Sequence, residues 1–164
     1  MGVRGLHNND DSSHDALPAA TQTGAGTFAC KIDGKTFIDR SSTFNCYYQY
    51  VNGGYYFGIS GEDEDLNPWS IHLGTVNRTV TEGETLQLLS REDGNAWGSA
   101  FFSTSPTNGT SNYTNSIHTG ELTITKFDET TDIVSGTFWF DVQHPVTGET
   151  VEIREGRFDT HFGH

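Results

Sequence analysis

Acidic side chains at alternate positions are the residues of this chain best suited to bind a metal ion. Asp63, Asp65 and Asn67 lie two residues apart in the densest acidic run of the sequence. Carboxylate and amide oxygens at this spacing supply the first ligands of a calcium-binding loop. The pattern then departs from an EF-hand, because Pro68 stands where that loop needs glycine and Gly74 where it needs glutamate. We therefore expect either a looser calcium site or a solvated loop between two strands.

Histidine, serine and glycine are not spaced for catalysis in this chain. The seven histidines form neither an H-x-x-x-H nor an H-E-x-x-H pattern, which a catalytic zinc site would need. The sequence also contains no G-x-S-x-G nucleophile elbow and no glycine-rich phosphate loop that leads into a helix. We therefore predict that the protein is not an enzyme and that it needs no cofactor, with calcium as the one ion to be considered.

The two cysteines, Cys30 and Cys46, both fall on the inward side of the strands predicted for them. A disulfide between them would close a short loop and stabilise the fold by about 3 kcal/mol, which suits an exported chain. The alternative is a pair of reduced thiols that pack as small apolar side chains. The sequence has no C-x-x-C pattern, so neither a redox pair nor a zinc ligand set is predicted.

Aromatic side chains are the remaining candidates for a binding surface. Trp69, Trp97 and Trp139, together with several tyrosines, suit a face that binds a sugar or a peptide, because aromatic rings offer large contact areas. The alternative role for each ring is core or cross-strand packing. Trp139 stands between Phe138 and Phe140, so the alternation of a strand turns it to the opposite face from these two rings. An exposed Trp139 would mark a contact site.

These residues lie on segments in which apolar side chains alternate with polar ones. Leu122 and Ile124, for example, alternate with threonines, and a period of two predicts strands with one buried face. Turn sequences such as Asp33-Gly34 and Asn52-Gly53 separate the strands and are typical of hairpins. We predict an all-β fold in which an antiparallel meander of about nine or ten strands forms a sandwich or a flattened barrel.

Length and composition indicate one folded domain behind a polar leader. A chain of 164 residues buries roughly 70% of its unfolded surface, which is enough for one core. Residues 1–26 are polar and rich in turn-forming residues, and we predict that they form a disordered, flexible leader or tether. Residues 27–164 are predicted to form a single all-β domain. Within it, residues 104–116 are predicted to be one long loop.

The net charge of −13 restricts the partners of the protein. An acidic chain repels the phosphates of nucleic acids and the surface of anionic membranes, so no nucleic-acid partner is expected. No segment reaches the roughly 18 apolar residues of a membrane helix. The membrane is therefore expected as a partner only through a lipid anchor, which would lie ahead of the present first residue.

Two groups of short motifs lie near the ends of the chain. The upstream group consists of Leu17-Pro18, Ala20-Thr21-Gln22-Thr23-Gly24, Thr27-Phe28, Cys30 and Asp33-Gly34-Lys35. The downstream group consists of Gly136-Thr137-Phe138 with Phe140, Thr147-Gly148 and Gly156-Arg157-Phe158-Asp159. In this order the motifs resemble a family of domains of unknown function from secreted lipoproteins of Bacteroidota. The resemblance implies an exported, lipid-anchored β domain, and it brings no catalytic residues with it.

These observations favour a non-catalytic, exported domain of the cell envelope that acts as a binding or accessory module. Its expected location is the outer membrane or the cell surface as a lipoprotein, or the periplasm. The expected partner is an envelope protein or a glycan. The alternative is a protein that binds a small ligand or a glycan on its β-barrel or sandwich, and tryptophans in an open cleft would favour it.

Overall fold

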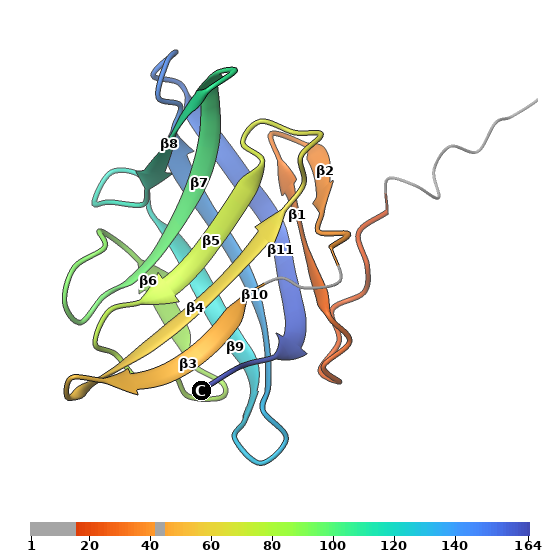
Figure 1. The fold of residues 1–164 in the computed structure, drawn as a ribbon, viewed down its shortest axis with the longest axis vertical. Coiled ribbons are helices and arrows are strands. Elements are labelled where there is room, and N and C mark those ends of the chain that lie inside the picture. The colour runs from red at the N-terminus through yellow and green to blue at the C-terminus, as the bar shows by residue number, and fades with distance from the viewer. Residues whose placement is uncertain (1–15, 42–44) are drawn as a thin grey trace, which may run out of the picture.

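The computed structural model describes residues 16–41 and 45–164, and strands are the only regular elements within those residues. Figure 1 shows how the strands curve around a common interior. In chain order they are β1 (Thr27–Ile32), β2 (Lys35–Ile38), β3 (Cys46–Val51), β4 (Gly54–Glu62), β5 (Ser70–Thr75), β6 (Thr85–Leu88), β7 (Ala96–Ser105), β8 (Asn108–Tyr113), β9 (Gly120–Asp128), β10 (Ile133–Gln143) and β11 (Thr150–His161). The all-β prediction is confirmed, with eleven strands in the described residues.

Tight turns whose residues have positive φ angles join β1 to β2 and β3 to β4. Asp33 and Gly34, between β1 and β2, have φ angles of 48° and 82°, and Asn52 and Gly53, between β3 and β4, have φ angles of 51° and 88°. Two consecutive residues with positive φ make the turn that matches the twist of a two-stranded ribbon. The hairpins predicted from the Asp-Gly and Asn-Gly pairs are therefore confirmed.

All eleven strands belong to a single sheet that curls without closing. Its order is β2-β1-β11-β10-β9-β6-β7-β5-β4-β3, and β8 pairs with β7 beside this path. Neighbouring strands run antiparallel except β6 and β7, which share one parallel pair, Leu88 and Ala96. β9, β10 and β11 form the predicted meander, but the first strand, β1, pairs with the last, β11. This pairing brings the upstream and downstream motifs together.

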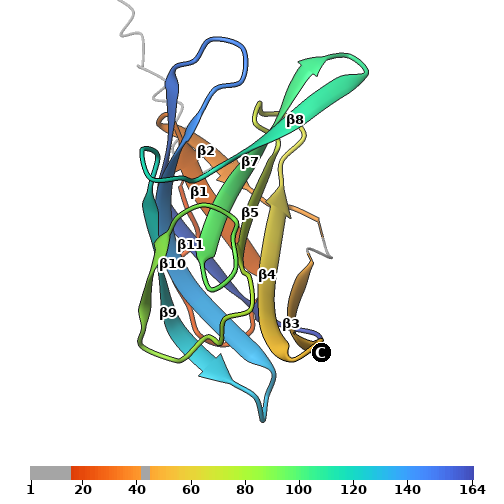
Figure 2. The same ribbon diagram turned by 90° about the vertical axis from the view of Figure 1, so that its left-hand side faces the viewer.

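Residues 104–116, predicted to be one long loop, contain a strand instead. β8 pairs with β7 antiparallel, so the connection between the two strands is only a turn at Pro106 and Thr107. Figure 2 shows this hairpin projecting from one end of the molecule, the same end as the turn between β10 and β11. The loop prediction was wrong because β8 shows no apolar alternation and has no buried residue. Ladder hydrogen bonds to β7 hold a strand whose faces both lie outside the core.

Aromatic rings from opposite strands fill the inside of the curled sheet. The ring of Phe57 on β4 lies 6.2 Å from the ring of Phe158 on β11, and both are buried. Phe140 on β10 lies against Gly98 on β7, where a Cβ atom would come within 3.0 Å of the ring. Interiors of this kind are packed to the density of crystals. The sheet therefore resembles a flattened barrel with a filled core rather than a hollow cup.

Hydrogen bonds cover part of both edges of the open sheet. At the β2 edge, Glu62 N donates to Asp39 Oδ2 at 3.0 Å and links the end of β4 to the end of β2. At the β3 edge, Tyr48 N donates to Gly163 O at 2.8 Å. Because edge strands with unpaired backbone groups invite aggregation, these contacts protect the fold as well as stabilising it.

The carboxylate of Asp159, near the end of β11, holds the segment that precedes β1. It accepts hydrogen bonds from Thr21 Oγ1 at 2.6 Å, from Thr23 N at 2.9 Å and from Gly24 N at 2.8 Å. Ser135 Oγ on β10 donates to it at 2.7 Å. Burial by itself raises the pKa of Asp159, but these donors outweigh burial and hold the pKa well below its usual range. We call Asp159 and these four donors the clasp.

The clasp connects the two groups of motifs near the chain ends by hydrogen bonds. Its donors at positions 21–24 belong to the upstream group, and Asp159 ends the downstream group. Arg157 of the same group donates from Nη1 to Pro18 O at 3.0 Å. Residues 21–25 fall in the range predicted as leader, and hydrogen bonds to Asp159 hold them in the structure. Figure 1 shows the segment in red where it leads into β1; residues 1–15 lie outside the described residues.

Both cysteines are free thiols in the core. Cys30 lies on β1, Cys46 begins β3, and both side chains are buried. Burial raises the pKa of Cys46 to about 12. Burial, and after it the charge of Asp63, also raises the pKa of Cys30. The structure thus has the reduced thiols that pack as apolar side chains, which was the alternative to a disulfide.

Candidate binding groove

A groove of about 270 Å³ crosses the outer face of the sheet over β3, β4, β5, β7 and β8. Tyr47 on β3 lies at one side of it, and Trp97 on β7 and Tyr113 on β8 lie at the other. Arg91 reaches it from the loop between β6 and β7. Further polar side chains in its lining are Asn45, Ser60, His72, Ser99 and Ser111. We call this feature the outer groove.

Two glycines let the aromatic rings of the outer groove lie directly on the backbone of the sheet. Gly58 on β4 pairs with Tyr47, and Gly74 on β5 pairs with Trp97. A Cβ atom on Gly58 would come within 2.5 Å of Tyr47 Cζ, and one on Gly74 within 2.7 Å of Trp97 Cζ2. Each ring therefore occupies the space that a side chain on the glycine would fill. It covers the glycine backbone and compensates for the weakening that a glycine causes in a strand.

Arg91 is stacked on the aromatic side of the outer groove. Its guanidinium carbon lies 4.8 Å from the centre of the Trp97 ring and 5.8 Å from that of Tyr113. Nη1 also donates to Tyr113 Oη at 3.3 Å. Contacts between a cation and an aromatic face contribute roughly 0.5–1 kcal/mol at exposed sites. The stacking holds the guanidinium in place while its edge carries further N–H donors.

The loop that carries Arg91 is tied to the strands beside it. Thr114, which follows β8, is buried and donates from Oγ1 to Leu89 O at 2.6 Å. The same oxygen accepts from Gly98 N on β7 at 3.0 Å. One hydroxyl thereby joins the end of β6 to β7 and to the end of β8. Arg91, two residues after Leu89, projects from a loop whose start is fixed.

His72 on β5 lies in the outer groove close to a serine. Its Nε2 lies 2.8 Å from Ser70 Oγ, and the tautomer decides which of the two atoms donates. Burial lowers the pKa of His72, and the positive charge of Arg91 lowers it further. The imidazole is therefore neutral at pH 7 and offers hydrogen bonds without charge. The Ser70 hydroxyl belongs to a residue that is 1% exposed, so it is shielded from solvent.

The outer groove differs in its charge from four other concavities of the described surface. Among the described residues, its lining includes Arg91 and no carboxylate, although the chain has 22 acidic and 9 basic residues. Four other concavities of the described surface contain acidic residues: Glu121 and Glu155 in the first, Glu129 in the second, Asp33 and Asp65 in the third, and Glu62, Asp63, Glu64 and Asp65 in the fourth. Of these five places, the outer groove repels an anion least.

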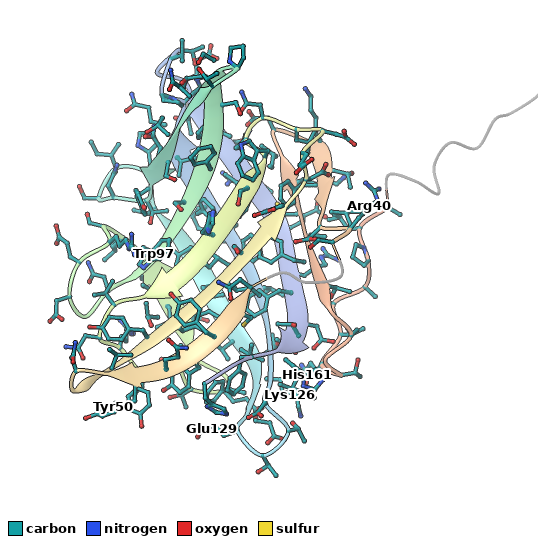
Figure 3. The ribbon with its side chains drawn as sticks, viewed as in Figure 1. Arg40, Tyr50, Trp97, Lys126, Glu129 and His161 are labelled. Atoms are coloured by element: carbon teal, nitrogen blue, oxygen red, sulfur yellow. The ribbon has the colours of Figure 1, made fainter. Side chains whose placement is uncertain are left out.

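The structure places the three predicted tryptophans apart from one another. Trp97 lines the outer groove, is 8% exposed, and has a buried Nε1 with no hydrogen-bond partner among the described residues; Figure 3 labels it on the side of β7. Trp69, just before β5, packs its ring edge-on against Phe101 at 5.1 Å. Trp139 lies on the outer face of β10 with the guanidinium of Arg154 5.2 Å from its ring. The three do not form one aromatic face.

The predicted calcium ligands do not converge either. Asp63 accepts from Ile38 N of β2 at 3.4 Å and from Asp65 N at 3.2 Å. Asn67 faces β7 instead, where it exchanges two hydrogen bonds of 3.0 and 2.9 Å with the backbone of Ser103. The part of the chain that the structure describes contains no group of three histidine, cysteine or acidic side chains placed to hold a metal ion. The acidic run thus links strands in the structure.

Arg91 and Tyr113 belong to the outer groove but were not predicted as site residues. Arg91 stands in a turn-like, acidic stretch, and Tyr113 ends a polar segment that was predicted as loop. Their contact with Trp97 depends on the pairing of β7 with β8 and on the position of β6, which the sequence pattern does not give. The one usable signal was the glycine at position 74, a strand glycine that the ring of Trp97 covers.

A second aromatic group lies at the hairpin between β3 and β4. Tyr50 is 65% exposed and Tyr55 is 37% exposed, with their ring centres 5.0 Å apart. Tyr48 stacks on Tyr55 at 5.1 Å and connects this group with the core. Glu129 lines the concavity beside it, and Figure 3 labels Tyr50 and Glu129 at the lower end of the molecule. This surface carries a negative charge, unlike the outer groove.

Comparison with protein families shows where the chain belongs. The model described as Domain of unknown function (DUF6252) matches residues 28–160. The chain is a member of this family. The matched range runs from β1 to β11 and includes both the outer groove and Asp159, and the expected resemblance to a family of unknown function is confirmed at this level.

Two further findings accompany the family match. Comparison with curated proteins and with solved structures gives no match. Within the described residues, no helix has the length and hydropathy needed to cross a membrane.

Proposed function

We propose that this DUF6252 domain is a non-catalytic binding module that holds a small polar ligand in the outer groove. The observation that carries the proposal is the combination of side chains there: partly exposed tyrosines, several hydroxyl groups and a stacked arginine. Ligand sites typically unite aromatic contact area with a few well-placed polar groups. A volume of about 270 Å³ suits a ligand the size of a monosaccharide.

Because the core of the curled sheet is filled, the outer groove is a better place for the ligand than the interior. Phe57, Phe140 and Phe158 occupy the inside of the curled sheet and are fully or almost fully buried. A carrier that encloses its ligand needs a cavity in that position. The predicted alternative, a small-ligand or glycan-binding β protein, therefore takes the form of a domain that binds on its outer face.

Titration of the labelled protein with a panel of neutral and acidic monosaccharides and disaccharides tests the proposal. Two-dimensional ¹H–¹⁵N NMR follows the indole N–H of Trp97, which is assigned with a Trp97→Phe variant. Ser60→Tyr places a ring in the outer groove and is expected to abolish the shifts. Thr137→Tyr fills the concavity beside Trp139 instead and is the matched control.

Two outcomes would contradict the proposal. One is a panel in which no sugar shifts residues of the outer groove. The other is binding that Thr137→Tyr removes and Ser60→Tyr leaves intact. If Ser60→Tyr does not fold, Ser111→Tyr on β8 fills the same groove from the other side.

We propose further that the domain is exported and tethered at the cell envelope of a member of the Bacteroidota. The resemblance of the short motifs supports this proposal. The proposed partner is an envelope protein or a glycan, and the lipid would be attached ahead of the present first residue. Fractionation of cells that produce the natural precursor, combined with metabolic labelling by a palmitate analogue, tests this. A precursor found in the cytosol without lipid would contradict it.

A further inference from the structure

We infer that the ligand of the outer groove carries a carboxylate, and that an acidic sugar unit is the class of ligand that the groove fits. The inference rests on the proposed function and adds the chemistry of the ligand to it. It starts from Arg91, the one charged side chain that the described residues contribute to the lining, and from the uncharged groups around it.

Arg91 has no carboxylate partner among the described residues. Among the described residues, no carboxylate lies within ion-pair distance of it, whereas Arg154 pairs with Asp141 at 2.8 Å and Lys31 with Glu155 at 3.7 Å. Within the part of the chain that the structure describes, the side chain of Arg91 makes one hydrogen bond to another side chain, the Tyr113 hydroxyl. In a chain of net charge −13, an arginine without a carboxylate has its donors available to an external anion.

The position of Arg91 favours a planar, two-oxygen anion. Trp97 and Tyr113 contact the guanidinium at 4.8 and 5.8 Å. A planar guanidinium pairs with a carboxylate through two parallel N–H···O bonds. Because the rings already restrict the side chain, less rotamer freedom is lost when the anion binds.

The remaining lining fits the hydroxyl groups of a sugar. Ser60, Ser99 and Ser111 offer hydroxyls that both donate and accept, Asn45 offers an amide, and the neutral His72 offers a ring nitrogen. The exposed part of Tyr47 at the other side offers an aromatic surface. A ligand with one carboxylate and several hydroxyls satisfies both parts of the lining, whereas a simple anion uses Arg91 alone.

Parallel titrations with D-glucuronate, D-glucose and acetate separate these contributions. The readouts are NMR shifts at Trp97 and the dissociation constant of each compound at fixed ionic strength. We expect glucuronate to bind about tenfold or more tightly than glucose, because charge-assisted hydrogen bonds discriminate by that much. Acetate is expected to bind more weakly than glucuronate, because it lacks the hydroxyl contacts.

Arg91→Gln is expected to remove the preference for glucuronate over glucose. Arg40→Gln is the matched control, since it makes the same change of charge at an exposed residue outside the outer groove; Figure 3 labels Arg40 and Trp97 at well-separated places. An unchanged preference in Arg91→Gln, with the fold intact by NMR, would overturn the inference.

The outcomes also distinguish this inference from the proposed function. Glucose that binds the groove as tightly as glucuronate overturns the acidic ligand and leaves the binding module standing. Acetate that binds as tightly as glucuronate overturns the sugar. If none of the three compounds shifts the groove, the inference fails, and the wider sugar panel alone decides the proposed function.

Discussion

Asp159 gathers donors from the segment before β1 and from β10 at a position that is closed to water. Asparagine keeps the shape of the side chain but removes its charge and brings an NH₂ group among the donors. Hydrogen bonds to charged groups contribute roughly 1.5–3 kcal/mol each. We expect Asp159→Asn to lower the free energy of unfolding by about 3 kcal/mol in urea titrations. Exposed Asp65→Asn is the control, and equal losses in both variants would contradict the role of the clasp.

The same carboxylate makes stability depend on pH in the acidic range. Its pKa is lowered in the folded protein, while an unfolded aspartate titrates at about 3.9. Its contribution is therefore fully present above that value and is lost as the pH falls below it towards the folded pKa. Urea titrations at pH 7, 4 and 3 should show the gap between the wild type and Asp159→Asn narrowing with acid. A gap that stays constant would contradict the assignment.

The two buried thiols are expected to make the stability of the fold fall as the pH rises into the alkaline range, the opposite of the effect of Asp159. Burial raises the pKa of Cys46 to about 12 and also raises that of Cys30, whereas an unfolded thiol titrates near about 8.5. The contribution of these groups to stability is present below the unfolded pKa and falls as the pH rises above it.

Burial of the two thiols should also slow their chemical labelling. We expect labelling by a thiol reagent at pH 8 to be at least about 100-fold slower in the native protein than in urea. Equal rates would show that the thiols are accessible.

At the scale of elements, Thr114 joins three strands around one hydroxyl. Thr114→Val keeps the volume but leaves Leu89 O and Gly98 N without this partner. An unsatisfied buried group costs about 1–3 kcal/mol, and we expect a loss of that order in the free energy of unfolding. Hydrogen exchange in the loop around Arg91 should become faster as well. Thr110→Val on the exposed part of β8 is the control, and the same exchange rates in both variants would contradict the role of Thr114 in holding the loop.

Sequence patterns predicted elements well where a turn or a buried face was encoded locally. Asp33-Gly34 predicted its hairpin because two positive φ angles favour those residues, and the alternation around Trp139 predicted its outward direction. β8 was not predicted as a strand because none of its residues is buried. The outer groove was not predicted for a different reason: Tyr47, Arg91, Tyr113 and Trp97 line the same groove only because of the order of the strands, and that order is fixed by contacts between distant parts of the chain.

At the scale of the whole molecule, one open sheet makes two surfaces with different roles. Its inside is filled by aromatic rings, and glycines such as Gly98 give those rings room. The same device on the outside, at Gly58 and Gly74, places rings where a strand would normally show small polar residues. The sheet can therefore support a binding surface without giving up its core. The clasp then secures β11, which lies between β1 and β10 in this sheet.

The segment before β1 and Asp159 should act as one stabilising unit. With the chain 16–164 as reference, we expect removal of residues 16–25 to lower the free energy of unfolding, because Asp159 loses Thr21, Thr23 and Gly24 as partners. In a double-mutant cycle, adding Asp159→Asn to the shortened chain should cost far less than in the reference chain. Additive losses would show that the segment stabilises the fold independently of Asp159, and that the upstream and downstream motifs are not one physical device.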